Sequence, residues 1–349
     1  MSRTAAARTM LPPRHWYSDP LSCLQACLGT ALLHSGAEPL HALGLRWEFF
    51  CQPGRIRREE FYYPCRSDGD VAASIAPFYP VSSRWWTPGA GADPLSELRV
   101  VLRGRQPVIA AVDNFYLPFR PAYSDVHAAH LVTVWGVDDE RGEVHVLDST
   151  PPAYSGPVAS ADFLRAWASA NPADRQDAFF SDSAIGYRCL LVDFTGPQPS
   201  LGRAELAGAL RANLSDLSSD DADDPHGSTW AGLAGLRRYL GYLADQGMAG
   251  DAGVLADAYP FGWAVQAQTY LHAELLRELG SRWRLPALRE AASAVADVAW
   301  AWTGVRMTAA HGMSEQSVAR TLRRHCDRVL RRYQDAIDAL GEAVTEVGQ

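Results

Sequence analysis

The clearest hydrophobic pattern in the chain predicts a β-hairpin between residues 130 and 148. HLVTVWGV (130–137) is a run of β-branched and aromatic residues, and EVHVLD (143–148) alternates polar and apolar residues as far as Val146. Both patterns favour strands. The connection DDERG (138–142) carries turn-forming residues and ends in a glycine. The pattern therefore predicts two antiparallel strands joined by a turn.

The register of this hairpin brings two polar side chains together. A hairpin folded around residues 139–141 pairs residues whose numbers sum to about 280. Asp148 then lies across from Val132 and diagonal to His130, on the same face of the sheet. His127 lies three residues before His130, so the two point in opposite directions along a strand and only one is expected to be chemical. We expect that one to be His130, with His127 in the loop before the strand.

A lone histidine such as His130 is most often a half-buried side chain with satisfied hydrogen bonds. A carboxylate placed to orient the imidazole changes this expectation, because His with Asp on its second nitrogen supplies the base and the orienting group of a nucleophilic triad. The pair of His130 and Asp148 therefore predicts a nucleophile elsewhere in the chain.

An apolar helix upstream offers that nucleophile. Ser18 or Asp19 can serve as its N-cap, Pro20 suits the first helical position, and Gly36 ends the pattern. Cys23 then falls at the end of the first turn.

Two cysteines lie in this helix, and their positions predict different roles. Free backbone N–H groups and the helix dipole lower the pKa of a thiol near the helix start, so Cys23 is expected to be the reactive one. Cys27 lies one turn further along, where the dipole has faded, and is expected to be a small buried hydrophobic residue.

The remaining pattern predicts two domains. A helix from Asp93 to Gly104, a buried strand at 107–114 and a strand at 184–194 complete an α+β domain with a mixed or antiparallel sheet, spanning residues 1–196. Beyond residue 196 the composition changes to Ala, Leu and Arg at helical spacing. We expect residues 197–349 to form an all-α bundle of about five helices.

In chain order, Cys23 at a helix start, His130 on a strand and Asp148 on the next strand reproduce the setting of papain-like enzymes. The segments LSCLQACLGTALLHSGAEPLHALGLRWEFF (21–50) and VDNFYLPFRPAYSDVHAAHLVTVWGVDDERGEVHVLD (112–148) also resemble the butirosin biosynthesis protein H family. The resemblance covers roughly residues 16–193. It implies a papain-like fold for this part of the chain.

The resemblance also implies a function, namely a cysteine-dependent acyltransferase of natural-product biosynthesis. The donor would be an acyl carrier protein or another acyl thioester, and the acceptor a small-molecule amine or another nucleophile. Such a reaction needs no metal and no organic cofactor. The same Cys-His-Asp triad would also suit a thioesterase, a cyclase or a cysteine peptidase, and a non-catalytic binding module could retain the fold.

Further residues are candidates for binding the substrate or its oxyanion. The backbone N–H of Cys23 can donate one hydrogen bond to an oxyanion, and Tyr17 or Ser18 could supply the second donor. Asp113 and Tyr116, at the end of the buried strand, are candidate pocket residues. A capping Asp and a packing Tyr are equally good interpretations of that pair.

Composition adds limits on partners and location. The 349 residues carry a formal net charge of -8, which argues against nucleic acid as the main partner. The six cysteines show no CxxC spacing, and the N-terminus lacks an apolar segment of signal-peptide length. A reduced, cytoplasmic protein is expected. We expect no membrane partner, because no apolar run approaches transmembrane length.

Overall fold

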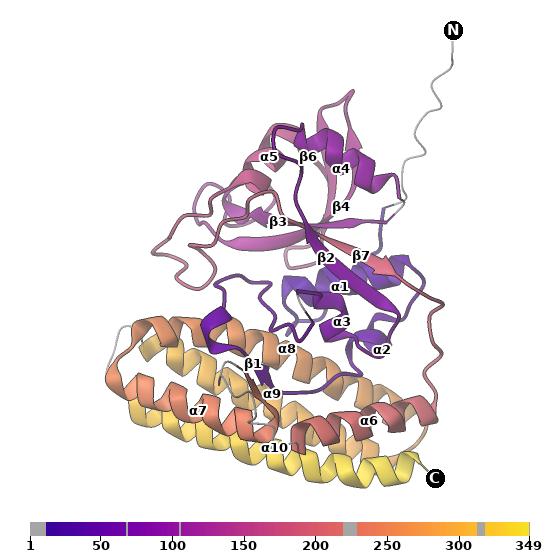
Figure 1. Cartoon of the computed structure of the whole chain (residues 1–349), viewed down its shortest axis with the longest axis vertical. Helices are drawn as coiled ribbons and strands as arrows, with labels where there is room; N and C mark the ends of the chain where they lie inside the picture. Colours follow the sequence, from indigo (N-terminus) through magenta and orange to yellow (C-terminus); the bar gives the residue numbers. More distant parts are fainter. Residues whose placement is uncertain (1–11, 68, 105, 219–228, 313–317, 349) are drawn as a thin grey trace.

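The structure, a computed structural model, has a six-stranded sheet with flanking helices and a bundle of long helices below them (Figure 1). It describes residues 12–67, 69–104, 106–218, 229–312 and 318–348. The prediction of an α+β N-terminal part followed by a helical bundle is confirmed.

The sheet is antiparallel throughout and has the order β2-β7-β3-β4-β5-β6. Its strands are β2 (Val81–Trp86), β3 (Val108–Asp113), β4 (Ala129–Asp138), β5 (Glu143–Asp148), β6 (Tyr154–Ala159) and β7 (Cys189–Phe194). The central strand β3 is buried along its whole length, as its unbroken apolar run predicts. Strand β6 contains Gly156 and Pro157, two residues that are unfavourable in strands, and pairing with the edge of β5 makes it a strand.

The register of the β4–β5 hairpin confirms the pairing predicted near its open end. Thr133 pairs with Leu147 and Val134 with Val146, so their numbers sum to 280. Closer to the turn the sum becomes 281, and a bulge at residue 135 absorbs the extra residue. The bulge lies beyond His130 and Asp148, so both side chains keep the same face.

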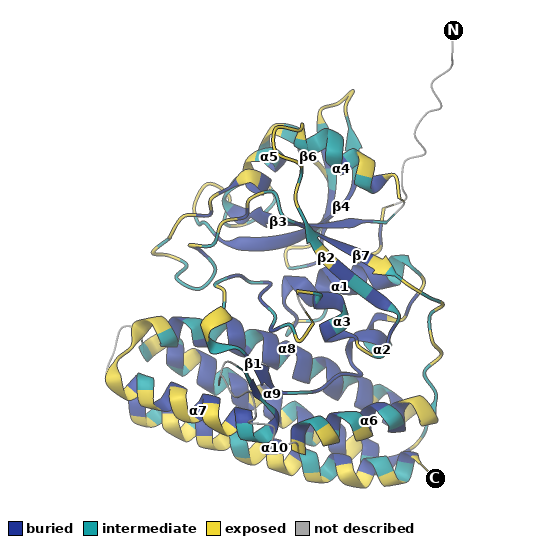
Figure 2. Ribbon diagram, in the orientation of Figure 1, coloured by how far each residue is buried: buried dark blue, intermediate teal, exposed yellow. Residues whose placement is uncertain are grey.

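The described part of the N-terminal region contains the α-helices α1 (Cys23–His34), α2 (Pro39–Leu43), α3 (Val71–Ile75), α4 (Pro94–Leu102) and α5 (Ser160–Ala168). Helices α1, α3, α4 and α5 contact the sheet, whereas α2 packs on α1 and α8 (Ala252–Arg282). Helix α1 packs on β4 and α5 packs on β3. Residues of α1 from its start to Leu32 are buried on every side, because the helix lies between the sheet and the rest of the chain (Figure 2).

The predicted start of this helix is wrong by three residues. The backbone N–H of Leu21 donates to the carbonyl of Ser18, so Ser18 to Leu21 form a separate turn that contains Pro20. Ser22 is extended and takes the N-cap position, which makes Cys23 the first residue of the helix. The thiol is therefore nearer to the helix N-terminus than the sequence pattern indicated.

The bundle contains α6 (Arg203–Ser218), α7 (Gly232–Ala249), α8 (Ala252–Arg282), α9 (Pro286–Gly312) and α10 (Ala319–Val347). This agrees with the five helices expected. No helix among the described residues is long and apolar enough to cross a membrane. The proposed domain boundary near residue 196 lies between the end of β7 and the start of α6, and it stays a prediction.

A segment of the N-terminal part reaches into the bundle. Strand β1 (Phe50–Cys51) pairs with β8 (Trp230–Ala231), just before α7. Trp47 and Phe49 are fully buried, and Trp47 stacks between rings from α8 and α10. The apolar core is therefore continuous from the sheet to the bundle.

Candidate active site

Cys23 lies at the junction of the helix N-terminus and the sheet. It is fully buried, and α1 packs on β4. As the first helical residue, its backbone N–H belongs to the group that has no partner within the helix. The position suits a nucleophile, because the oxyanion that forms on the attacked substrate carbonyl needs a backbone N–H donor.

His130 is held by the hydrogen bond that the hairpin register predicts. Its Nε2 lies 2.9 Å from Oδ2 of Asp148, and both side chains are buried. Val112 pairs with His130 across β3 and β4, and neighbouring residues on each strand point to the opposite face. The imidazole is on the face of the sheet that α1 covers, since a ring nitrogen lies within 4.8 Å of the Cys23 sulfur. Asp148 fixes its orientation.

Asp148 is itself fixed by two further donors. Nη1 of Arg120 donates to its Oδ2 at 3.0 Å, and the backbone N–H of Thr150 donates to its Oδ1 at 2.9 Å. Burial acts to raise the pKa of this carboxyl, but His130 and Arg120 outweigh it and lower the pKa below its usual value. Asp148 therefore carries its negative charge at neutral pH.

Glu60 is the member of this group that the sequence did not reveal. Its Oε2 lies 2.5 Å from Nδ1 of His130, and its backbone N–H donates to the carbonyl of Ala129 at 3.3 Å. The side chain is 11% exposed, so it lies between the buried imidazole and the protein surface. The segment that carries it has no clear period, and a pair of acids after three arginines offered the only local signal.

The two carboxylates change the protonation of His130. Burial alone would lower the pKa of the imidazole, but Glu60 and Asp148 outweigh it and raise the pKa to about 9. In this arrangement His130 is an imidazolium at neutral pH.

The predicted low pKa of the Cys23 thiol is wrong for this closed arrangement. Burial is the main cause, and the nearby charge of Glu60 adds to it, so the pKa is raised well above its usual value. The helix-start argument considered the dipole but could not include the burial that other segments impose. Cys23 is therefore a neutral thiol here.

Comparison with known protein families places this site in context. Residues 22–149 match the family described as Butirosin biosynthesis protein H, N-terminal. These residues are a butirosin biosynthesis protein H N-terminal domain. Cys23, Glu60, His130 and Asp148 all fall within it. A search of curated proteins found no match to the chain.

Tyr17, a predicted site residue just before this domain, lies close to the group around Cys23. The charges of Glu60, Arg120 and Asp148 act on its phenol, although burial is the main reason that its pKa is raised. Its hydroxyl donates to the carbonyl of Asp19 at 3.4 Å, a long hydrogen bond. Tyr17 remains the candidate for the second oxyanion donor. Ser18 is engaged with Tyr270 of α8 at 3.1 Å.

Cys27 has the surroundings of a structural residue. Its Sγ lies 3.7 Å from the carbonyl of Leu131, and burial raises the pKa of its thiol. This agrees with its interpretation as a small buried side chain.

Asp113 and Tyr116 are not part of the group around Cys23. Asp113 pairs with Ala129, one residue from His130, so its side chain is on the opposite face of the sheet. Its carboxylate accepts hydrogen bonds from Ser169 at 2.6 Å and is 2.7 Å from Nδ1 of His127. Tyr116 packs against His127, which lies in the loop before β4, as expected. A substrate-binding role for Asp113 and Tyr116 stays a prediction without support from the Cys23 site.

Two groups of described residues in this part of the chain have metal-ligand chemistry. In the candidate active site, ligand atoms of Cys23, Glu60 and His130 lie within 4.8 Å of one another. A second group, formed by Asp138, Glu143 and His145, lies at the turn end of the β4–β5 hairpin.

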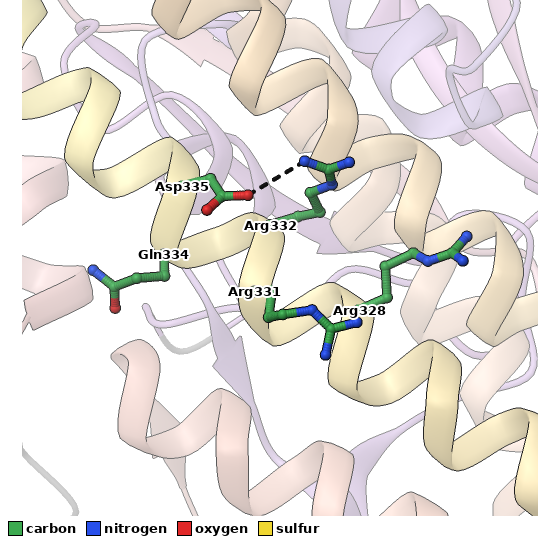
Figure 3. Close-up of a pocket in the computed structure, with 5 residues that line it drawn as sticks. All are labelled: Arg328, Arg331, Arg332, Gln334 and Asp335. Atoms are coloured by element: carbon green, nitrogen blue, oxygen red, sulfur yellow. Dashed lines mark hydrogen bonds and ion pairs between the residues drawn. The ribbon is translucent and has the colours of Figure 1, made fainter.

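A hollow on the bundle is separate from this site. It lies on α10 and is lined by Arg328, Arg331, Arg332, Gln334 and Asp335, with Arg332 and Asp335 forming an ion pair of 3.3 Å (Figure 3). Figure 1 shows α10 along the base of the bundle, away from α1. The hollow therefore does not lead to Cys23.

Proposed function

We propose that this protein is a cysteine-dependent acyltransferase that moves an acyl or aminoacyl group from a carrier-protein thioester to a small-molecule amine. The observation that carries this proposal is the buried group of Cys23, His130 and Asp148 inside a butirosin-type domain. A thiol, an imidazole and an orienting carboxylate are the parts of a covalent acyl-transfer site.

The chemistry divides into two steps. In the first, the neutral form of His130 takes the proton of the Cys23 thiol, and Sγ attacks the thioester carbonyl. The bond to the carrier sulfur breaks, an acyl-Cys23 thioester forms, and His130 passes the proton to the departing carrier thiolate. In the second, the acceptor amine attacks that thioester, His130 takes the amine proton, and Cys23 leaves as the thiolate and is reprotonated. The product is an amide, and the enzyme returns to its starting state.

Access to Cys23 requires a local rearrangement. The thiol and the imidazole are both fully buried, and the side chain of Glu60 lies between the imidazole and the protein surface. The neighbouring Glu59 is bound to Arg188 at 2.6 Å and to Ser183 at 2.8 Å, which fixes the same segment to the loop before β7. We infer that the Glu60 side chain keeps water away from Cys23 until the acyl donor binds and displaces it.

The test of the proposal is the mass of the intact protein after mixing with simple acyl thioesters. We expect one acyl adduct in the wild type and in Cys27→Ala, and none in Cys23→Ala. Cys27→Ala is a matched control, because it removes a buried thiol from the same helix one turn away.

Adding amines to the acylated protein separates the remaining possibilities. Loss of the adduct with formation of an amide supports transfer, whereas release of free acid at the same rate with and without amine would indicate a thioesterase. Cleavage of peptides would indicate a peptidase. The absence of any adduct with carrier-bound and free thioesters would contradict the proposed function and favour a binding module.

Glu60→Gln is expected to shift the pH dependence of acylation to lower pH. Glu60 helps to raise the pKa of His130 to about 9 and also raises the pKa of Cys23. At pH 7 a base of that pKa is neutral in about one molecule in a hundred. Removing the charge lowers both pKa values, so the rate at pH 7 should rise on the order of tenfold. The measurement is the acylation rate between pH 5 and 10.

The control for this change is Glu140→Gln in the exposed hairpin turn, which should leave the profile unchanged. A Glu60→Gln profile that coincides with the wild type, or moves to higher pH, would show that Glu60 does not set the protonation of His130 during acylation.

A further inference from the structure

Three kinds of zinc ligand converge at the candidate active site. A thiol from the start of α1, an imidazole from β4 and a carboxylate from the segment before α3 place one ligand atom each within 4.8 Å of the others. Thiolate, imidazole and carboxylate are all common zinc ligands, and three protein ligands are enough when a water molecule takes the fourth position.

Nε2 of His130 is hydrogen-bonded to a carboxylate, as is usual for the nitrogen of a metal-binding histidine that does not contact the metal. Asp148 is 2.9 Å from Nε2 of His130, so Nδ1, on the side of Glu60, is the nitrogen available to a metal. A metal-binding histidine usually donates its other N–H to a carboxylate, which fixes the ring and its tautomer. Arg120 holds that carboxylate in turn, at 3.0 Å.

Charge also favours a divalent cation at this position. Cys23 as thiolate and Glu60 as carboxylate would balance the two positive charges of the ion, with His130 neutral. Asp148 and Arg120 form a further pair that is neutral overall. The ion would therefore occupy a buried position without leaving an unbalanced charge.

We propose that Cys23, Glu60 and His130 bind a zinc ion, and that acylation of Cys23 is blocked while the ion is bound. Ligand atoms around tetrahedral zinc are about 3.5 Å apart, given the usual bond lengths. Glu60 is 2.5 Å from Nδ1, so its carboxylate must withdraw by about 1 Å to admit the ion. The side chain lies at the exposed edge of the group, where such a movement meets the least packing.

The experiment uses the full chain, reduced and stripped of metal with a chelator, and titrated with zinc or with cobalt as a spectroscopic probe. We expect one ion per chain and a thiolate-to-cobalt charge-transfer band. Cys23→Ser should abolish the band, and Glu60→Gln should weaken the affinity at least tenfold. Both variants are close in size to the native residue, and circular dichroism will establish that they fold.

His145→Ala is the matched control, because it removes the imidazole of the competing group on the hairpin. That group contains no thiol, so uptake of the ion with the charge-transfer band intact in His145→Ala supports the proposal. No band in the wild type, a band that persists in Cys23→Ser, or uptake lost only in His145→Ala would overturn it.

Zinc binding does not depend on the proposed function, whereas the block on acylation does. Titration of the ion and formation of the acyl adduct are therefore measured separately. Zinc uptake without any adduct in the metal-free protein would contradict the acyltransferase proposal and leave the zinc site standing. Acylation at an unchanged rate with saturating zinc would overturn the block.

Discussion

Asp148→Ala should reduce the rate of Cys23 acylation by about ten-thousandfold, the loss seen when the orienting acid of a triad is disabled. The change removes the acceptor that fixes Nε2 of His130 and leaves the guanidinium of Arg120 without its buried partner. The imidazole can then rotate or adopt the wrong tautomer. The measurement is the rate of adduct formation in a single turnover.

Asp148→Asn distinguishes orientation from loss of the fold. Its side-chain oxygen can still accept from Nε2, but its NH₂ group would face either Arg120 or the backbone N–H of Thr150, both of which are donors. We therefore expect Asp148→Asn, which keeps the size of the side chain, to fold normally and yet to acylate about ten-thousandfold more slowly than the wild type. Asp193→Asn, on an exposed position of β7, serves as the control. An Asp148→Ala variant that folds and acylates at the normal rate would exclude Asp148 as the orienting group.

The part of the site that could be predicted from sequence depends on short-range patterns. The alternation in β5 and the β-branched run in β4 set the strands, and the turn length set their register, so the contact between His130 and Asp148 followed. The apolar helix located Cys23 near its start in the same way. These features involve residues that are neighbours in sequence or across one hairpin.

The parts that could not be predicted arise from contacts between distant segments. Glu60 reaches His130 across 70 positions of sequence, from a segment without a hydrophobic period. The raised pKa of Cys23 comes from burial by those same segments. The start of α1 also differed, since the turn at Ser18 competes with a helix that begins at Pro20. Local propensity cannot decide such competitions.

Trp47→Ala should lower the free energy of unfolding by about 3–5 kcal/mol, the usual cost of removing a fully buried large aromatic side chain. Trp47 stacks on His272 and on Tyr333, with ring centroids 5.7 Å and 5.2 Å away, and its Nε1–H donates to Thr269 at 3.2 Å. It comes from the segment between α2 and β1, so its loss disturbs the connection between the N-terminal part and the bundle. Equilibrium unfolding in urea measures the effect.

Trp300→Ala is the matched control, because the same side chain on α9 is 74% exposed and its removal should change stability by no more than about 0.5 kcal/mol. A Trp47→Ala variant as stable as this control would contradict the packing of Trp47 against His272 and Tyr333. The shape of the unfolding curve carries further information. Because the core is continuous from the sheet to the bundle, we expect the wild type to unfold in one transition. If Trp47→Ala unfolds in two, with acylation of Cys23 persisting through the first, the bundle is a separate unit, as the predicted boundary near residue 196 requires.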